Sequence, residues 1–450
     1  MFETAGIEVS GCVTTTRIGK LSSSGGQLSC YTSKETQKGL KSIFEFTASI
    51  FDEFIIDDFF MTDCQCEDCQ KARGRRSMAE YRCDLMNEVS REYIIKPAKA
   101  INPKVKIILK YPLWYDFFHW RGYEVLGETA SYDMIWVGTE TRDYDYYVSD
   151  SGDVQYKAYF IMRWLGGIGG AKTGGGWFDN LYTSPDTYAE QARQTVLADA
   201  REMMLMNYGE NIRRPDNIEK LRREIPGLFE LAKMVRNKPL KGVVATKPAN
   251  SDPYDNFDAT EPFSITKPDV YVYDFIGMLG LPLIPSTGID TNADAVFFPV
   301  QALKDPMLSE KLMKMLSENK PVLITDGLAE RIGNIGQYKN LTVLPVNGNT
   351  HSLLKLSREK LNAIRDRMLA PIGIKFDAPS KVGLYLIGDD ILVIENFNVT
   401  SVNVAVDTKF SMEAQVKLIL PQEGRVNPEF TGRQIKINRI PPRTLVAIKY

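Results

Sequence analysis

Three closely spaced cysteines are the densest group of potential ligands in this sequence. Cys64, Cys66 and Cys69 form a Cys-x-Cys-x-x-Cys run. Thiolates are good zinc ligands, and this spacing is typical of a metal site and not of a disulfide framework. A tetrahedral site needs a fourth ligand, which must come from elsewhere in the chain. The run therefore predicts a closed, structural zinc site, and the alternative is a turn with reduced, unligated thiols.

Carboxylates are the second group with chemical potential. The chain has only two histidines, so Asp and Glu become the expected acids and bases. Asp57 and Asp58 end an apolar run, and successive strand residues point to opposite faces, so one of them should enter a site. Placing two acidic side chains at the end of a buried strand costs folding free energy, which favours a functional role for the pair. The alternative is a pair that caps the strand and binds Arg73 or Arg75.

Two more carboxylates follow later apolar runs. Glu140 lies in the phrase Gly-Thr-Glu-Thr-Arg after one run, and Asp179 ends another. Two carboxylates at one site could act together as an acid and a base. The better strand pattern before Glu140 favours that residue. Either acid could instead be solvated in a loop.

Polar and aromatic side chains beside these carboxylates are candidates for substrate binding. Flat rings stack on the apolar faces of sugars, and the alternative for the aromatic residues is a hydrophobic plug between loops. The glycine-rich residues 166–176 predict a flexible loop near the site. The substrate-binding candidates are Asp57, Tyr111, Trp114, Trp177 and Asn207.

The elements that must position these residues alternate between β-type runs and amphipathic stretches. Helices are expected at residues 34–51, 78–96 and 184–201, the second of them closed by Pro97. Strands are expected at 7–14, 53–60, 105–111, 133–140, 174–179 and 202–208. This alternation predicts an α/β fold with a parallel sheet. No glycine-rich phosphate motif follows a strand, so a (β/α)₈ barrel with its site at the carboxyl ends of the strands is favoured. Six strands instead of eight suggest that the chain begins inside the barrel.

The second half of the chain predicts two further domains. Apolar runs at 242–246, 281–285, 295–299 and 321–325 indicate a Rossmann-like α/β domain, and residues 382–450 are rich in strand patterns. The expected division is a barrel at 1–236 with the cysteine knot, a Rossmann-like domain at 237–378 and a C-terminal β-sandwich at 379–450. A length of 450 residues agrees with two or three domains.

Composition excludes several partners. A formal net charge of −2 provides no basic field for nucleic acid, and no apolar run approaches the roughly 20 residues of a membrane span. Residues 1–11 lack the pattern of a signal peptide, and with reduced cysteines this slightly favours the cytoplasm. The compartment stays open because a start inside the barrel would also remove a leader.

The order of these features resembles family 42 of the glycoside hydrolases, a β-galactosidase-like group of retaining barrel enzymes. The passage from Cys30 to Cys69 carries the resemblance, with Asp57-Asp58 in the place of the family's Asn-Glu pair. The resemblance implies that Asp58 is the general acid/base and Asp57 its partner or a substrate hydrogen-bond acceptor. It also implies Cys30 as the fourth zinc ligand and Asp179 at the position of the nucleophile. Asp179 and Glu140 thus remain alternatives.

The resemblance also suggests assembly and activity. In that family the Rossmann-like domain mediates trimer formation. A homo-oligomer is therefore expected, and the resemblance implies a trimer. The expected function is hydrolysis of an oligo- or polysaccharide by two carboxylates. Aspartate in place of glutamate shortens the acid by one methylene, which could misplace it. The alternatives are a catalytically inactive barrel that binds sugars or serves as a structural subunit, and a different barrel hydrolase that uses the same strand ends.

Overall fold

The computed structural model describes residues 6, 8–57, 59–142, 154–206, 214–253, 269–333, 335, 338–409, 417–420 and 426–449. The chain forms two compact units. The first contains the described residues up to Gly138 together with Leu165–Gly176, and the second contains the other described residues. Among the described residues, no helix has the length and apolar character needed to cross a membrane.

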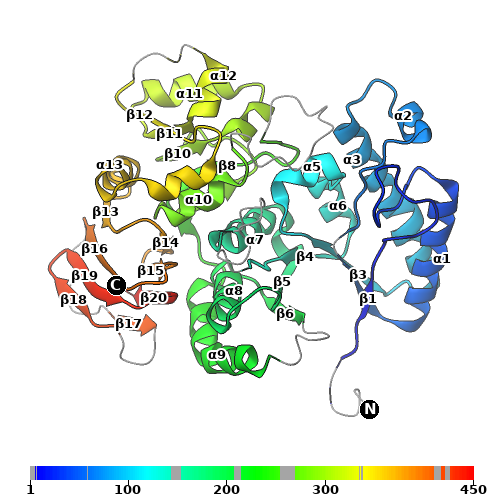
Figure 1. The fold of residues 1–450 in the computed structure, drawn as a ribbon, viewed down its shortest axis with the longest axis horizontal. Helices are drawn as coiled ribbons and strands as arrows, with labels where there is room; N and C mark the ends of the chain where they lie inside the picture. Colours follow the sequence, from blue (N-terminus) through cyan, green and yellow to red (C-terminus); the bar gives the residue numbers. More distant parts are fainter. Residues whose placement is uncertain are drawn as a thin grey trace. The chain divides into compact units, whose positions relative to one another are not determined.

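A parallel sheet organises the first half of the chain (Figure 1). Its order is β1-β2-β3-β4-β5-β6, which confirms the six expected strands. Register is set by pairs such as Ile55 with Ile108, both of them buried, and continuous burial is what parallel strands covered by helices require. The strands are β1 (Gly11–Val13), β2 (Glu53–Ile56), β3 (Lys106–Tyr111), β4 (Met134–Gly138), β5 (Thr173–Asp179) and β6 (Glu202–Met206).

Helices follow the strands as the sequence predicts, with one correction. Ser77 forms a capping box with Glu80 at the start of its helix, but Pro97 does not end that helix. A π-helical turn precedes Pro97, in which the Lys96 amide donates to the Arg91 carbonyl, five residues back. Because this wider turn replaces the regular α-helical hydrogen bonds that proline disrupts, the helix continues. The elements are α1 (Lys34–Ile50), α2 (Glu67–Arg73), α3 (Met78–Val89), η2 (Ser90–Ile95), α4 (Lys96–Ile101), η3 (Tyr115–Phe117), α5 (Phe118–Arg121) and α6 (Val125–Ser131).

The glycine-rich segment 166–176 is a second correction, because it is regular structure and not a loop. It contains the end of α7 (Tyr156–Gly169), the short helix η4 (Gly170–Lys172) and the start of β5. A Cβ atom at Gly174 would collide with Met134 on β4, so glycine there permits close packing between neighbouring strands. Helix α8 (Pro185–Leu197) begins after its N-cap Ser184, at the expected start of the third helix, and α9 (Pro215–Val235) follows β6.

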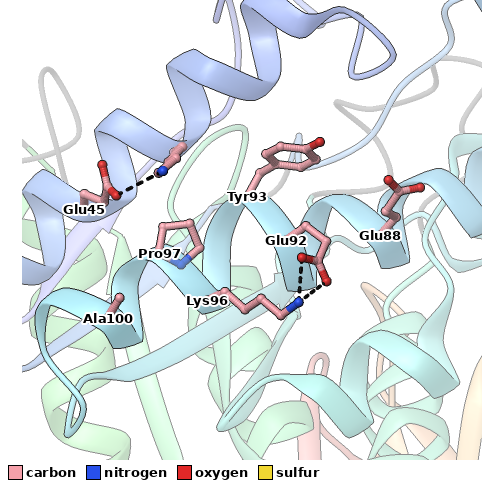
Figure 2. Close-up of a pocket in the computed structure, with 8 residues that line it drawn as sticks. Glu45, Glu88, Glu92, Tyr93, Lys96, Pro97 and Ala100 are labelled. Carbon is pink, nitrogen blue, oxygen red and sulfur yellow. Dashed lines mark hydrogen bonds and ion pairs between the residues drawn. The ribbon is translucent and has the colours of Figure 1, made fainter.

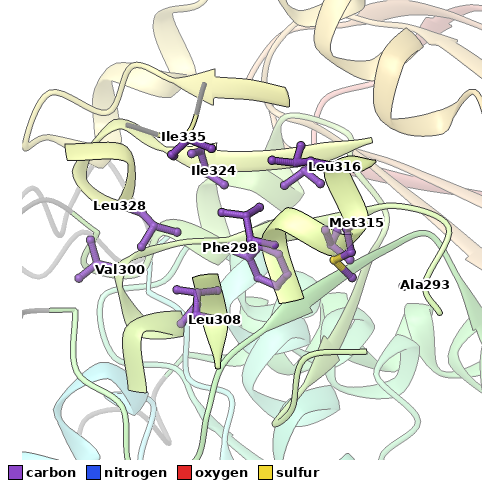
Figure 3. Close-up of a cluster of buried hydrophobic side chains, with 13 residues drawn as sticks. Ala293, Phe298, Val300, Leu308, Met315, Leu316, Ile324, Leu328 and Ile335 are labelled. Atoms are coloured by element: carbon purple, nitrogen blue, oxygen red, sulfur yellow. The ribbon is translucent and has the colours of Figure 1, made fainter. Parts of the chain in front are cut away.

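In the second unit, five parallel strands have the order β12-β11-β10-β8-β9, which confirms the expected Rossmann-like sheet. Its core lies against α11, where Met315 and Leu316 pack near Phe298 and Ile324 (Figure 3). The strands are β8 (Val243–Thr246), β9 (Leu283–Ser286), β10 (Val296–Phe298), β11 (Val322–Thr325) and β12 (Leu341–Leu344). The helices are α10 (Val272–Met278), η6 (Val300–Lys304), α11 (Leu308–Ser317), α12 (Asp326–Ile332), η7 (Thr350–Lys355) and α13 (Arg358–Leu369).

The C-terminal region forms two antiparallel sheets, which confirms the expected β domain. One has the order β13-β16-β19-β18 and the other β17-β20-β15-β14-β7. Strand β7 (Leu240–Lys241) precedes the Rossmann-like sheet in the chain but pairs with β14. The other strands are β13 (Ile374–Asp377), β14 (Val382–Ile387), β15 (Ile391–Asn396), β16 (Val402–Thr408), β17 (Lys417–Leu420), β18 (Pro428–Thr431), β19 (Gln434–Ile440) and β20 (Thr444–Lys449).

Candidate active site and cysteine cluster

Asp57 lies at the carboxyl end of β2 and faces a lysine from the neighbouring strand. Its Oδ1 atom is 3.7 Å from the Nζ atom of Lys110, whose side chain is 2% exposed. A nearby ammonium favours the ionised form of a carboxylate, so Asp57 is suited to hold charge and not to donate a proton. Asp58, the predicted acid/base, and Asn207 lie outside the described residues.

The residue after Asp58 has an unusual backbone that the sequence did not indicate. Phe59 has a φ of 84°, which is strained for a residue with a bulky side chain. Its carbonyl accepts from the Thr15 hydroxyl, and its amide donates to the Tyr123 hydroxyl. Backbone strain of this kind concentrates at functional sites. No sequence signal could have identified it, because the left-handed conformation is imposed by tertiary contacts on a non-glycine residue.

The predicted aromatic residues have different environments. Tyr111 is fully buried, and its ring centroid lies 5.7 Å from that of Phe118. Burial holds the pKa of Tyr111 well above its usual value. This environment favours the packing role over sugar stacking. Trp114 is half-buried, and its ring centroid is 5.9 Å from that of Phe59, which is 38% exposed.

In the second unit, an arginine joins the two remaining carboxylate candidates. The Nη2 atom of Arg142 lies 2.7 Å from Oδ2 of Asp179 at the end of β5. The Nη1 atom of the same arginine is 3.5 Å from the main-chain oxygen of Glu140. Both Asp179 and Glu140 are buried. The sequence analysis noted Arg142 only as part of the phrase after β4, because nothing in its spacing indicates a partner on the next strand.

Hydrogen bonds to β5 fix the segment that carries Glu140 and Arg142. The Thr139 amide donates to the Trp177 carbonyl at 2.7 Å, and the Thr139 hydroxyl donates to the same oxygen at 3.2 Å. Thr195 on α8 donates to that hydroxyl at 2.8 Å. Trp177 is 2% exposed, so its ring, predicted to stack on sugar, is enclosed by protein.

The four predicted zinc ligands come together in the first unit. The sulfur atoms of Cys30, Cys64, Cys66 and Cys69 all lie within 4.8 Å of one another. The Cys30–Cys66 distance is 3.8 Å, and both Cys30–Cys69 and Cys66–Cys69 are 3.7 Å. Four thiolates about 2.3 Å from a tetrahedral zinc would be about 3.8 Å apart. The spacing of the donors therefore fits this metal.

Polar groups around the cluster are arranged for negatively charged sulfur. The Thr32 hydroxyl lies 3.0 Å from the sulfur of Cys69, the Lys20 ammonium 3.6 Å from Cys66, and the Ser23 amide 3.5 Å from Cys64. Such outer hydrogen bonds orient metal ligands and stabilise their charge. The loop before α1 and the loop after β2 are thereby joined at this cluster.

A surface groove of about 580 Å³ lies on the helical side of the first unit, between α1 and the π-helical segment (Figure 2). It is lined by charged side chains that pair with one another, including Lys41 with Glu45 and Lys96 with Glu92. None of the predicted site residues lines this groove. The groove therefore does not contribute to the carboxylate site.

A parallel sheet with carboxylates after its strands, followed by a Rossmann-like sheet and two β sheets, is an arrangement also found in glycosidases of the barrel fold. Two solved structures have this fold. Alpha-L-fucosidase isoenzyme 2 from Paenibacillus thiaminolyticus aligns with a TM-score of 0.65 and 10% identity over 100% of this chain and 88% of its own. A catalytic mutant of a GH42 beta-galactosidase from G. stearothermophilus aligns with a TM-score of 0.60 and 11% identity over 99% of this chain and 89% of its own.

The sequence comparison identifies the family. Residues 1–254 match the family described as probable glycosyl hydrolase, catalytic domain, and the chain belongs to this family. An uncharacterized protein of Saccharolobus solfataricus is 28% identical over 312 residues, which are 61% of this chain and 48% of that protein. The match thus spans about half the length of this curated relative.

Proposed function

We propose that the chain hydrolyses a glycosidic bond in an oligo- or polysaccharide with two carboxylates. The observation that carries the proposal is the placement of acids at the ends of strands β2, β4 and β5 of one sheet, in a chain of a glycosyl hydrolase family. The carboxyl ends of such strands meet at one edge of the sheet, where barrel enzymes have their sites. The architecture supports a β-galactosidase-like enzyme related to family 42.

The proposed chemistry assigns a role to each acid. Asp58 gives its proton to the glycosidic oxygen as the bond between that oxygen and the anomeric carbon breaks. In the same step, Asp179 or Glu140 either forms a bond to the anomeric carbon or takes a proton from the water that attacks it. If a glycosyl-enzyme forms, Asp58 takes a proton from water, which then attacks the anomeric carbon and releases the carboxylate. Asp57, paired with Lys110, keeps a negative charge beside the proton donor. The exposed ring of Phe59 and the half-buried ring of Trp114 form a surface on which a sugar ring could stack.

The four-cysteine cluster is proposed to hold a structural zinc ion. Cys30, Cys64, Cys66 and Cys69 would supply all four ligands, so the ion has no open position for substrate. Its contribution is to fix the loop after β2, which follows Asp57 and Asp58. The outer donors Lys20, Ser23 and Thr32 would stabilise the thiolates.

The organisation beyond the barrel is part of the proposal. We propose the division into a barrel at 1–236, a Rossmann-like domain at 237–378 and a C-terminal β domain at 379–450. We further propose that the Rossmann-like domain supports a homo-oligomer, such as a trimer. Sedimentation at micromolar concentration checks this, and a monomer would contradict it.

A panel of 4-nitrophenyl glycosides and of natural polysaccharides tests the activity. The expected result is release of nitrophenol from at least one glycoside by the wild type, and loss of that activity in the double variant Asp179→Asn/Glu140→Gln. Asp84→Asn, at an exposed ion pair in the first unit, serves as a control and should retain full activity. Sugar binding in calorimetry without hydrolysis of any glycoside would instead favour the inactive, sugar-binding barrel.

A further inference from the structure

We infer that Arg142 is a positioning residue that keeps Asp179 ionised and oriented, which makes Asp179 and not Glu140 the second carboxylate of the reaction. The inference rests on the proposed function and deepens it, because the sequence left these two acids as alternatives. It follows from three features of the second unit. These are the hydrogen bonds to the Asp179 carboxylate, the hydrogen bonds that fix the segment carrying Arg142, and the contact of Arg142 with the main chain of Glu140.

Both carboxylate oxygens of Asp179 are held by donors. Arg142 binds Oδ2 at 2.7 Å, and the Leu181 amide donates to Oδ1 at 3.0 Å. The pair is shielded from water, since the Arg142 side chain is 18% exposed and that of Asp179 is 8% exposed. A carboxylate oxygen has two lone pairs, so each oxygen can accept these bonds and still present a lone pair to a reacting atom. An ionised, oriented carboxylate is what a nucleophile or a water-activating base requires.

Arg142 itself is tethered to the strand that carries its partner. Thr139 binds the Trp177 carbonyl twice, two residues before Asp179, and the Thr141 amide closes a turn onto Thr139 at 2.9 Å. A guanidinium held by such a segment loses little further freedom when it binds the carboxylate. The geometry of the pair is therefore set by the backbone and not by substrate.

Arg142 distinguishes the two acids because it uses different groups on them. On Asp179 it binds the carboxylate, whereas on Glu140 it meets the main-chain oxygen at 3.5 Å. Two described side chains of α8 near Asp179 do not compete for this role. Burial and the Asp179 charge raise the pKa of Tyr188 on α8 to about 12, so this phenol stays neutral at the pH of the reaction. The Gln191 side chain, also on α8, accepts from the Asp179 amide and carries no charge.

Kinetics of Arg142→Gln and Arg142→Lys test the role on the 4-nitrophenyl glycoside that the wild type cleaves. Arg142→Gln should lower kcat by about 10²-fold with little change in KM, since an oriented donor is lost at the reacting group. The acidic limb of the pH profile of kcat/KM should move to higher pH, because a carboxylate without its cation binds protons more readily. Arg142→Lys should return this limb toward the wild-type position and recover only part of kcat, because lysine restores the charge but not the planar fork.

The matched control is Arg236→Gln, which removes another arginine–aspartate ion pair of the second unit, 3.2 Å from Asp199. It should leave the pH profile unchanged, so a shift in Arg142→Gln cannot be a general effect of lost stability. An unshifted acidic limb in Arg142→Gln, or activity retained in Asp179→Asn but lost in Glu140→Gln, would overturn the inference.

A double-mutant cycle in thermal unfolding tests the pair without any substrate. Arg142→Gln and Asp179→Asn together should destabilise the protein by less than the sum of their separate effects, since both remove the same interaction. Additive effects would overturn the pairing itself. Coupled effects in a protein that hydrolyses no glycoside would contradict the proposed function and leave the ion pair intact, so the two failures are distinguishable.

Discussion

The Nζ atom of Lys110 lies 3.7 Å from the Oδ1 atom of Asp57, and the lysine side chain is almost completely buried. A buried ammonium is stable only beside compensating charge, so the two residues depend on each other. Their strands β2 and β3 are neighbours in the sheet. The pair therefore joins the ends of two strands where the catalytic acid is expected.

Loss of the ion pair between Asp57 and Lys110 should lower the free energy of unfolding. Asp57→Asn removes the charge that Lys110 faces and should lower the free energy of unfolding by about 1–3 kcal/mol. Chemical denaturation at neutral pH measures this. Asp84→Asn removes the partner of Arg76 at the exposed surface and should change the stability by less than about 0.5 kcal/mol. Equal effects of the two substitutions would contradict a buried pair.

The residue that donates the proton can be identified by comparing substrates with good and poor leaving groups. Asp58→Asn retains the size of the side chain but cannot transfer a proton, so hydrolysis of a natural glycan should fall by about 10²–10⁴-fold. A 4-nitrophenyl glycoside needs little protonation and should be affected much less, whereas Asp179→Asn should be severely impaired on both substrates. Full activity of Asp58→Asn on the natural glycan would exclude it as the acid.

Zinc should be present at about one ion per chain when the protein is purified without chelator. Cys64→Ser should lose the metal, measured by elemental analysis, and unfold at a lower temperature because metal binding contributes to folding. Cys12 is an exposed cysteine outside the cluster, and Cys12→Ser should keep both the zinc and the unfolding temperature. A metal-free wild type would refute the site.

Glu395 in the C-terminal sheet should make the free energy of unfolding depend on pH between about 4 and 8. Burial, followed by the nearby Glu190 charge, raises the pKa of Glu395 to about 8. In the unfolded chain a glutamate titrates near about 4.3, so the folded state holds this proton more tightly. Stability from this group is thus greatest at low pH and falls as the pH rises through about 8.

Unfolding temperatures between pH 5 and 9 check this expectation. Glu395 accepts from Gln194 on α8 and from Tyr385 on β14, and the arginine closest to it is Arg193. Glu395→Gln should flatten the decline between about pH 5 and 8, because the amide cannot ionise. Glu429→Gln on the exposed strand β18 should leave the decline in place. A decline that persists in Glu395→Gln would place its origin elsewhere.

The sequence predicted the architecture well because apolar periodicity and helix caps are local. The strands that end at or just before Asp57, Tyr111 and Asp179 follow from neighbouring residues, as does the start of helix α8. The two errors arose where tertiary packing overrides local preference. Gly174 permits close contact between neighbouring strands, and a π turn accommodates Pro97.

The site was predicted less completely, because ion pairs depend on distant parts of the chain. The spacing of Cys64, Cys66 and Cys69 is a local signal, and it correctly indicated a cluster that the structure forms with Cys30. The partner of Asp179 is Arg142 on another segment, and the partner of Asp57 is Lys110 on the next strand. Neither pairing has a spacing that a single sequence can reveal.

Strand β7 has a consequence for the synthesis of the protein. Leu240 and Lys241 leave the ribosome before the whole Rossmann-like sheet, yet their partners are Ile387 and Leu386 on β14. The C-terminal sheet is therefore interrupted in the chain by another folding unit, and its edge cannot close until translation has passed β14. If the Rossmann-like sheet folds early, it brings β7 and β14 closer together. The two strands then pair faster, because the loop between them is effectively shorter. Translation pauses within residues 243–386 would prolong the exposure of an unpaired strand edge, the kind of intermediate on which chaperones act.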